Sequence, residues 1–218
     1  MGFGKWIVAG AGLAVVGGVA YAQYRDTEEP AYDVLFEQGK FELRQYAPMI
    51  VAQVSHTGDR RRASTASFRR LAAYIFGQDR GDNGTGDDEK IAMTSPVYQS
   101  RVQQDEKIAM TAPVMQDRTG PGEWRMRFVM PSQYTMASLP TPPSDVAIEE
   151  LPGRRVAAVR FSGVAREADL AIMEARLSEW IERQGYIKTG DVEYAFYDAP
   201  MVPGPLRRNE VLIPVEAR

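Results

Sequence analysis

The chain contains no cysteine among its 218 residues. Disulfide frameworks, thiolate zinc sites and cysteine nucleophiles are therefore excluded, because each of them needs a cysteine sulfur. Histidine is almost as scarce, since His56 is the only one. Any imidazole chemistry would have to use that residue, whose place after a predicted strand favours an ordinary exposed or capping role.

A strong charge of either sign is also lacking. The formal net charge is −3 and the pI is about 5.4, and a cluster of arginines at residues 60–62 is only local. Such a balance does not produce the positive field that gathers a phosphate backbone, so we expect no nucleic-acid partner. The composition, 44% hydrophobic and 25% charged, is typical of a globular domain with a core.

One long hydrophobic run is present, at residues 6–22, and it contains no charged side chain. Its length is near the lower limit for a membrane-spanning helix, and Lys5 before it favours a cytoplasmic N-terminus. Ala20-Tyr21-Ala22 fits a signal-peptidase site equally well. We expect residues 1–25 to be a membrane anchor or a signal peptide, residues 26–31 a linker, and residues 32–218 one domain. That domain would be anchored on the exported, periplasmic side of the membrane, or secreted after cleavage.

An octet repeats within the domain. Residues 90–97 read KIAMTSPV and residues 107–114 read KIAMTAPV, so the copies differ only at Ser95 and Ala112. Apolar and polar positions alternate in both copies, which predicts strands, and Pro96 places the end of the strand at a sheet edge because it has no N–H to donate. The spacer at residues 100–105 suits a hairpin that pairs the two copies antiparallel.

The order of the expected elements repeats as well. Strands are predicted at residues 32–35, 41–46, 49–54, 124–130, 146–150, 155–161, 192–197 and 210–215, and helices at residues 60–76 and 166–184. Gly77 and Gly185 stand where helix C-terminal caps belong. Two similar halves follow, each with strands on both sides of one helix, and they predict an α+β domain in which a curved sheet carries two helices.

Several segments together resemble the SOUL/haem-binding protein family. They are residues 41–48 (FELRQYAP), both octets, residues 128–131 (FVMP), residues 161–163 (FSG) and residues 207–211 (RRNEV). The resemblance spans nearly everything from Tyr32 to Val215. It implies a distorted antiparallel β-barrel with two helices and a pseudo-twofold repeat, and the binding of haem or a related tetrapyrrole on an apolar surface.

The resemblance also bears on the haem iron. Some family members carry a histidine immediately before the tyrosine of the first segment and are thought to ligate iron through it, but this chain has Gln45 there. An amide is a poor iron ligand, so we expect non-covalent haem contact without a metal-ligating residue.

Candidate contacts with the macrocycle are chosen by side-chain chemistry. Aromatic rings offer flat apolar area, thioethers line forgiving pockets or ligate iron, and cations meet propionates. Core packing or surface solvation is the ordinary role of each of these side chains taken alone. The predicted haem-binding residues are Gln45, Tyr46, Phe68, Lys90, Met93, Met110, Trp124, Phe128 and Arg207.

No catalytic constellation is visible in the sequence. One histidine, no cysteine and scattered carboxylates give no spacing that predicts a triad or a metal site. The sequence therefore predicts a non-catalytic protein that binds a tetrapyrrole, for sequestration or transfer at a membrane. Two alternatives stay open: a module that binds another apolar small molecule or lipid, and a structural subunit of a membrane complex.

Overall fold

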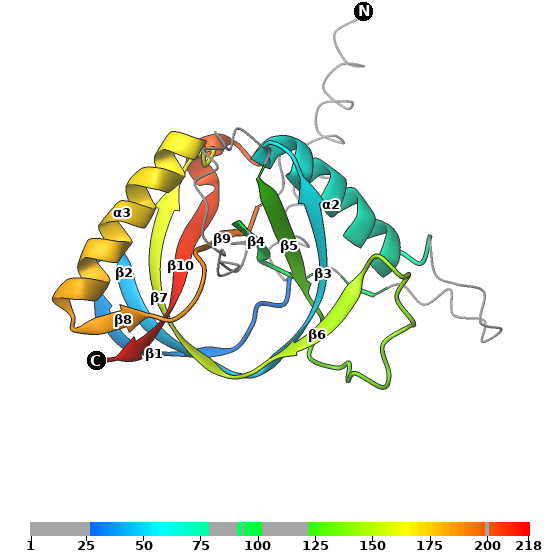
Figure 1. The fold of residues 1–218 in the computed structure, drawn as a ribbon, viewed down its shortest axis with the longest axis horizontal. Coiled ribbons are helices and arrows are strands. Elements are labelled where there is room, and N and C mark those ends of the chain that lie inside the picture. The colour runs from blue at the N-terminus through cyan, green and yellow to red at the C-terminus, as the bar shows by residue number, and fades with distance from the viewer. Residues whose placement is uncertain (1–26, 79–90, 93, 102–121, 199–200) are drawn as a thin grey trace, which may run out of the picture.

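A computed structural model describes residues 27–78, 91–92, 94–101, 122–198 and 201–218 of the chain (Figure 1). The predicted anchor or signal peptide, Lys90, Met93 and the whole second octet with Met110 lie outside these residues. In the part of the chain that is described, neither helix combines the length and the apolar character that a membrane crossing requires.

The described residues form ten strands, two α-helices and one 3-10 helix. In chain order they are β1 (Tyr32–Gln38), β2 (Phe41–Tyr46), β3 (Met49–Thr57), α2 (Arg60–Ile75), β4 (Val97–Arg101), β5 (Glu123–Val129), β6 (Ala147–Leu151), β7 (Arg154–Ser162), α3 (Glu167–Arg183), β8 (Tyr186–Lys188), β9 (Glu193–Phe196), η1 (Gly204–Leu206) and β10 (Arg208–Ala217).

One antiparallel sheet holds all the strands, and its order confirms the predicted two-fold repeat. The order is β1-β2-β7-β10-β9-β4-β5-β3-β6, with β8 paired to the end of β10. β9 and β4 lie at the centre of this order. Strands at equal distances from the centre occupy equivalent positions in the two halves: β10 corresponds to β5, β7 to β3, and β2 to β6. β2 of the first half pairs with β7 of the second, and β6 of the second half pairs with β3 of the first, which interlocks the two halves.

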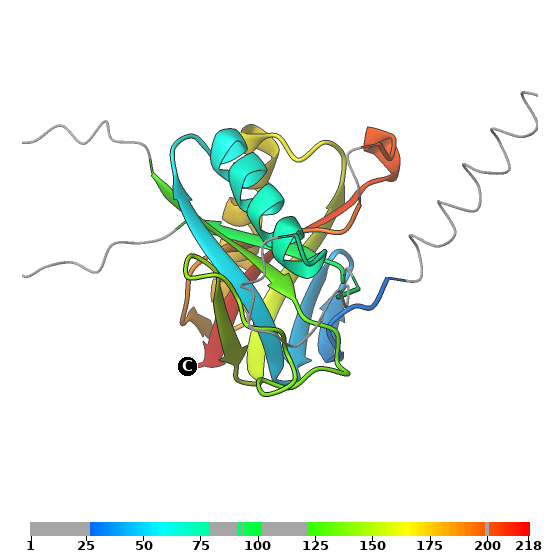
Figure 2. The ribbon, with the colours of Figure 1, turned by 90° about the vertical axis from the view of Figure 1, so that its right-hand side faces the viewer.

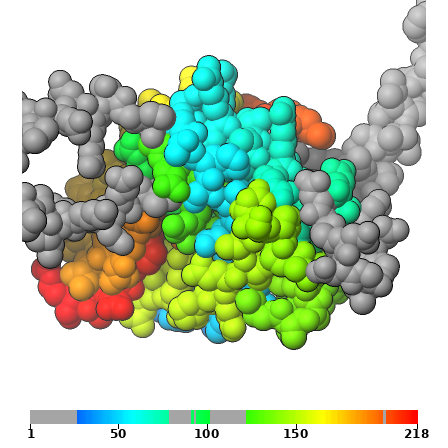
Figure 3. Space-filling model, turned by 45° about the vertical axis from the view of Figure 1, so that its right-hand side comes forward, coloured from blue at the N-terminus to red at the C-terminus, as the bar shows by residue number. Residues whose placement is uncertain are grey.

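The sheet curls into a half-barrel with both helices on its outside (Figure 1), so the predicted α+β distorted barrel is confirmed. Alternate strand residues face opposite sides. On the outer face, α3 packs through Leu177 and Trp180, and α2 packs through Leu71 and Ile75. The concave face has a separate apolar cluster drawn from both halves, with Tyr98 and Leu212 among its members. In Figure 3 the residues of β3 and α2, in cyan and teal, lie above the yellow-green residues that include β6.

Local signals explain where the helices begin and end. The side chain of Asp59 accepts a hydrogen bond from the backbone N–H of Arg62 at 3.1 Å, which caps α2. The turns after the helices use Gly77 at φ 74° and Gly185 at φ 77°, a backbone conformation that favours glycine. The predicted ends therefore agree with the structure to within about two residues, the usual scatter of helix boundaries.

The first octet differs from the prediction of a strand. It is irregular through its described residues up to Pro96, and β4 begins only at Val97. Its polar groups bond instead to other segments: Thr94 Oγ1 donates to the carbonyl of Val129, and the N–H of Ser95 donates to the carbonyl of Glu28 at 2.9 Å. These bonds hold residues 94–96 as a connector into the sheet.

The predicted hairpin between the octets is also different. Ser100 and Arg101, expected in the turn, belong to β4, which pairs with β5 on one side and β9 on the other. The remainder of the predicted turn and the second octet lie outside the described residues. β8 was not predicted, because three residues are too few for a visible alternation.

Candidate functional site

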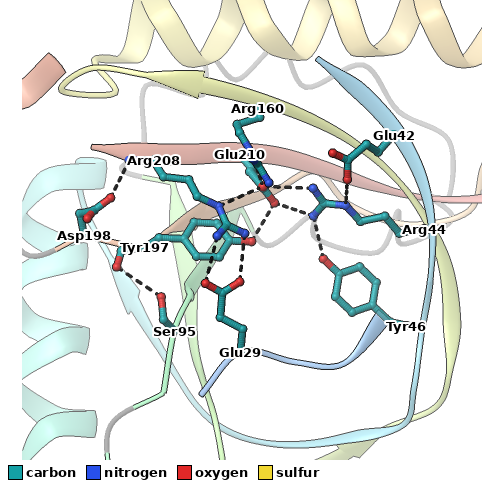
Figure 4. A network of polar contacts seen from close by, with 10 residues as sticks. All are labelled: Glu29, Glu42, Arg44, Tyr46, Ser95, Arg160, Tyr197, Asp198, Arg208 and Glu210. Carbon is teal, nitrogen blue, oxygen red and sulfur yellow. Dashed lines mark hydrogen bonds and ion pairs between the residues drawn. The ribbon is translucent and has the colours of Figure 1, made fainter. Parts of the chain in front are cut away.

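The concave face carries a buried carboxylate, Glu210 of β10, at the centre of a polar network (Figure 4). Arg44 donates to it from Nη1 at 2.6 Å and from Nη2 at 3.1 Å. The Tyr197 hydroxyl donates at 2.7 Å, and Arg160 and Arg208 reach the same carboxylate at 3.3 and 3.4 Å. A fully buried charge costs several kcal/mol unless it is paired in this way, so the network satisfies Glu210 rather than offering it to a ligand.

The protonation states follow from these contacts. Burial alone would raise the pKa of Glu210, but the hydrogen bond and charge of Arg44 outweigh it, so the pKa is lowered. Burial likewise opposes the charge on Arg44, yet Glu210 outweighs burial and raises the pKa of the guanidinium. Burial raises the pKa of Tyr46, which accepts a hydrogen bond from Arg44 at 3.1 Å, to about 12. At neutral pH the carboxylate and guanidinium are charged and the phenol is neutral.

A second buried carboxylate lies on the same face. Glu193 of β9 accepts two hydrogen bonds from Arg154, at 2.8 and 2.7 Å, and one from Arg127 at 3.2 Å. With Tyr46, Tyr98 and Tyr197, these networks fill the space between the halves, and all three rings are at most 7% exposed. The concave face therefore does not offer the apolar binding surface that the family resemblance implies, because the space between the halves is occupied by the protein's own side chains.

Three hollows open elsewhere on the described surface. A hollow of about 420 Å³ is lined by Met49, Ile50 and Met130, with Glu28, Glu29 and Glu150 as its charged lining residues. Another of about 640 Å³ lies at the start of α3 beside η1, with Lys40 and Arg166 in its lining. The third, about 560 Å³, lies between the N-terminal ends of α2 and α3. The first repels a dicarboxylate ligand, because its lining charges are all negative.

We call the third hollow the interhelical groove. It crosses the junction of the two halves on the outer face, where β4 and β9 meet, and it is lined by Gly58, Asp59, Arg60, Arg101, Gly122, Trp124, Glu167, Leu170, Ala171 and Tyr194. Leu170 and Ala171 supply an apolar wall from α3, and Trp124 and Tyr194 supply aromatic rings from β5 and β9. The guanidinium of Arg101 lies 6.0 Å from the ring centroid of Trp124.

Arg60, one of the two arginines in the lining, is only partly engaged in hydrogen bonds. Arg60 Nη2 donates to the carbonyl of Ala165 at 3.2 Å, whereas its Nε is buried without a hydrogen-bond partner among the described residues. The nearest carboxylate, that of Glu167, lies 3.9 Å from that nitrogen. The hydrogen bonding of this guanidinium is therefore incomplete within the described part of the chain.

Tyr194 and His56 are the groups near the groove that have the chemistry to ligate iron. The Tyr194 hydroxyl donates to Glu174 Oε2 at 2.9 Å, and burial together with this bond raises the pKa of the phenol well above its usual value. His56 is paired with Trp124 across β3 and β5, but its Nδ1 lies 2.9 Å from Ser67 Oγ of α2. The phenolate that would bind iron is therefore disfavoured, and the imidazole is turned towards α2.

The predicted haem-binding residues do not lie together in one site of the structure. Trp124 lines the interhelical groove. Phe68 of α2 and Phe128 of β5 contact each other edge to face, with centroids 5.4 Å apart, beneath α2. Tyr46 belongs to the concave face, and Gln45, its neighbour on β2, is half-buried and donates to the carbonyl of Tyr46 at 3.3 Å.

The other predicted contacts do not add to the groove. Arg207 Nε donates to the carbonyl of Val202 at 2.8 Å beside η1. Lys90, Met93 and Met110 lie outside the described residues. Arg60 and Arg101 line the groove but were not among the predicted binding residues. Arg60 lies in the first turn of a helix, and Arg101 lies at the end of a strand. Their position at one rim of the groove can be predicted only when the order of the strands in the sheet is known.

A comparison with known protein families identifies the family of this chain. The profile of the SOUL heme-binding protein family matches residues 27–107 and 99–214. The chain belongs to this family. The two matches overlap between the octets. Mouse heme-binding protein 1 is 41% identical over 87 residues, which are 38% of this chain and 44% of the mouse protein. The matched region thus spans under half of that relative.

Solved structures with the same fold are distant in sequence. The C-terminal domain of EcmrR superposes with a TM-score of 0.58 at 11% identity, over 86% of this chain and 99% of that domain. A hydrolase from Listeria innocua gives a TM-score of 0.51 at 14% identity, over 84% and 94% of the two chains. At such identities the likeness concerns the fold alone, whereas family membership supports haem or tetrapyrrole binding.

Proposed function

We propose that this protein binds haem or a related tetrapyrrole non-covalently in the interhelical groove, without a side-chain ligand to iron, and that it sequesters or transfers this ligand at a membrane. The observation that carries the proposal is the meeting of Trp124 and Tyr194 with Arg60 and Arg101 in one hollow at the junction of the halves. Family membership supports the ligand class.

The groove suits the two parts of a tetrapyrrole. The macrocycle is flat and apolar, and the rings of Trp124 and Tyr194 with the aliphatic wall at Leu170 provide apolar area for it. The propionates are carboxylates, and the guanidinium groups of Arg101 and Arg60 in the lining provide donors for them. In this arrangement apolar contact supplies most of the affinity, and the arginines fix the orientation.

The iron contributes little to the affinity. Among the ten lining residues there is no histidine, methionine or cysteine, and the Tyr194 phenol is held protonated beside Glu174. In the described part of the chain, no cluster of three or more histidine, aspartate or glutamate side chains offers a metal site either. We therefore expect iron-free protoporphyrin to bind almost as tightly as haem.

A non-catalytic role agrees with the side chains at hand. The single histidine is hydrogen-bonded to a serine, since Ser67 Oγ lies 2.9 Å from His56 Nδ1. Ser67 is only 1% exposed, because it lies on the face of α2 that packs against the sheet. A nucleophile has to reach its substrate, so this pair packs the helix rather than forming a dyad.

The membrane part of the proposal comes from the sequence. Residues 6–22 are apolar, and the domain follows them directly. A carrier held beside a bilayer has access to apolar pigments, which partition into lipid. Whether the segment is retained or cleaved decides between a tethered and a secreted carrier.

A titration tests the proposal. The full chain in detergent is titrated with haem and with iron-free protoporphyrin, and binding is followed by absorbance and by quenching of tryptophan fluorescence against a detergent blank. We expect saturable binding of one tetrapyrrole per chain, with affinities for the two ligands within about tenfold, or roughly 1.4 kcal/mol. The absence of saturable binding, or a preference for lipids over both porphyrins, would overturn it.

A further inference from the structure

Two neighbouring loops on one side of the domain expose large apolar side chains. Met201 is 86% exposed, Leu206 is 65% exposed and Val164 is 57% exposed. The loops touch: a Cβ at Gly204 would lie 3.1 Å from a methyl carbon of Val164, and Asn209 Nδ2 donates to the carbonyl of Gly163 at 3.0 Å. We call Val164, Met201 and Leu206 the apolar tip. Exposure of this size on adjacent loops marks a contact surface.

The N-terminal end of the described chain is fixed beside this tip. Glu29 accepts two hydrogen bonds from Arg208, each at 3.0 Å, and Arg208 follows Leu206 by two residues. Glu28 Oε1 accepts from the backbone N–H of Ser132 at 2.8 Å. The first described residues and η1 lie along the same side of the molecule in Figure 2. Residues 26–31 were expected to be a linker, and the described part of it is bonded to the domain.

The distance to the predicted membrane segment is short. That segment ends at residue 22 and the fixed part begins at Thr27. Five residues extend to at most about 17 Å. If the segment is inserted in a bilayer, the side of the domain that holds Glu28 and Glu29 has to stay within that distance of the membrane surface, and the apolar tip is on that side.

We propose that the apolar tip inserts into the interfacial region of the lipid bilayer, so that the domain docks on the membrane by this face. This inference rests on the membrane location in the proposed function and specifies the surface used. Lys40 and Arg166 line the hollow beside the tip, where their charged ends reach phosphate groups while Val164 and Leu206 enter the acyl boundary. The hollow beside η1 would then open at the lipid surface.

A lipid surface fits these side chains better than a second copy of the chain does. The tip bears aliphatic and thioether groups, and the hollow beside it is lined by two cations, Lys40 and Arg166, and one carboxylate, Asp169. Two such surfaces facing each other would therefore bring a net positive charge against its like. A bilayer accepts the apolar groups without demanding a matched shape. Apolar insertion also predicts docking that depends weakly on salt.

Because the chain contains no cysteine, a single introduced cysteine can be labelled at one known position. Leu206→Cys and Ile187→Cys variants of the full chain are labelled with an environment-sensitive NBD fluorophore and reconstituted into phosphatidylcholine vesicles. Ile187 is the matched control, because it is 43% exposed and lies just beyond the C-terminal end of α3. That helix has 17 residues and is about 25 Å long, and Leu206 lies in η1, beside the start of the helix.

We expect NBD at position 206 to shift to the blue and to lose at least half of its emission when the vesicles contain doxyl-labelled lipids, with no change at position 187. Equal behaviour of the two labels, whether both stay in water or both are quenched, would overturn the inference. So would shielding of position 206 that rises with protein concentration and ignores the quencher, since this indicates contact between copies. Haem titration of the same vesicles separates failure of the docking from failure of the proposed function.

Discussion

Arg44 and Glu210 stand 166 residues apart in the sequence, yet they form two hydrogen bonds of 2.6 and 3.1 Å inside the half-barrel. Their strands, β2 and β10, are not neighbours, because β7 lies between them. The pair therefore bridges three strands on the concave face and joins the first half of the chain to the second. Arg160 of β7 contacts the same carboxylate at 3.3 Å, so every strand of the bridge contributes to it.

Replacing Glu210 by glutamine should destabilise the fold strongly. The substitution keeps the shape but leaves the buried Arg44 guanidinium without its counter-charge, and breaking a buried pair in this way costs about 3–5 kcal/mol. Urea unfolding followed by circular dichroism measures the loss. The control is Glu179→Gln, because Glu179 is 67% exposed and bonds Arg183 one helical turn away; it should change the unfolding free energy by less than about 0.5 kcal/mol. Similar losses in the two variants would contradict the assignment.

The same carboxylate should make the stability depend on acid. Its pKa in the folded protein is lowered from 4.5, with Arg44 as the main cause opposing burial. The unfolded chain therefore binds the proton more readily, and the stabilisation is present above pH 4.5 and is lost as the pH falls through the folded pKa. Unfolding free energies measured from pH 6 down to about pH 3 should fall more steeply for the natural chain than for Glu210→Gln. Parallel curves would argue against this role of Glu210.

At alkaline pH the tyrosines of the concave face should make the stability of the folded protein fall as the pH rises. Burial raises the pKa of Tyr46 from 10.0 to about 12. The stabilisation from the neutral phenol is complete below pH 10 and is lost as the pH rises towards 12, because only the unfolded chain ionises easily in that interval. Tyr46→Phe removes this ionisation, so its unfolding midpoint should fall less between pH 9 and pH 11.5 than that of the natural chain. A spectrophotometric titration at 295 nm checks that Tyr46 ionises late.

Much of this fold can be predicted from the sequence, because the patterns that indicate strands and helix ends are local. Phe41 to Tyr46 alternates between an outer face under α3 and an inner face beside Glu210, and the glycines after both helices mark their ends. The partners of the strands are not local. Nothing in the sequence alone indicates that β2 pairs with β7 of the other half, and this exchange brings Arg44 to Glu210.

Haem affinity should depend on the groove. Arg101→Gln removes a candidate propionate contact, and Trp124→Leu removes aromatic area, so each should weaken binding about tenfold, which corresponds to roughly 1.4 kcal/mol. Arg183→Gln is the matched control, since Arg183 is 57% exposed at the far end of α3. Titrations of the three variants by fluorescence quenching measure the effect. Unchanged affinity in both groove variants would exclude this groove as the tetrapyrrole site.

The site was harder to predict than the fold for a physical reason. Aromatic and cationic side chains are chosen by chemistry, but a pocket is defined by which of them the strand order brings together. Phe128 and Trp124 lie on the same face of β5. Phe68 covers Phe128, however, whereas Trp124 lines the groove. Arg60 at the start of α2 and Arg101 at the end of β4 line one groove because β4 pairs with β5, the strand against which α2 packs.

His56→Ala should leave the haem spectrum almost unchanged. The imidazole Nδ1 bonds to Ser67 at 2.9 Å, and His56 is not part of the groove lining. A Soret band with only a modest shift from free haem is therefore expected for both the natural chain and the variant, and affinity should stay within about threefold, or roughly 0.7 kcal/mol. Stability should drop by about 1 kcal/mol, because the buried Ser67 hydroxyl loses its partner. A six-coordinate spectrum in the natural chain that disappears in the variant would instead make His56 the iron ligand and would move the macrocycle towards α2.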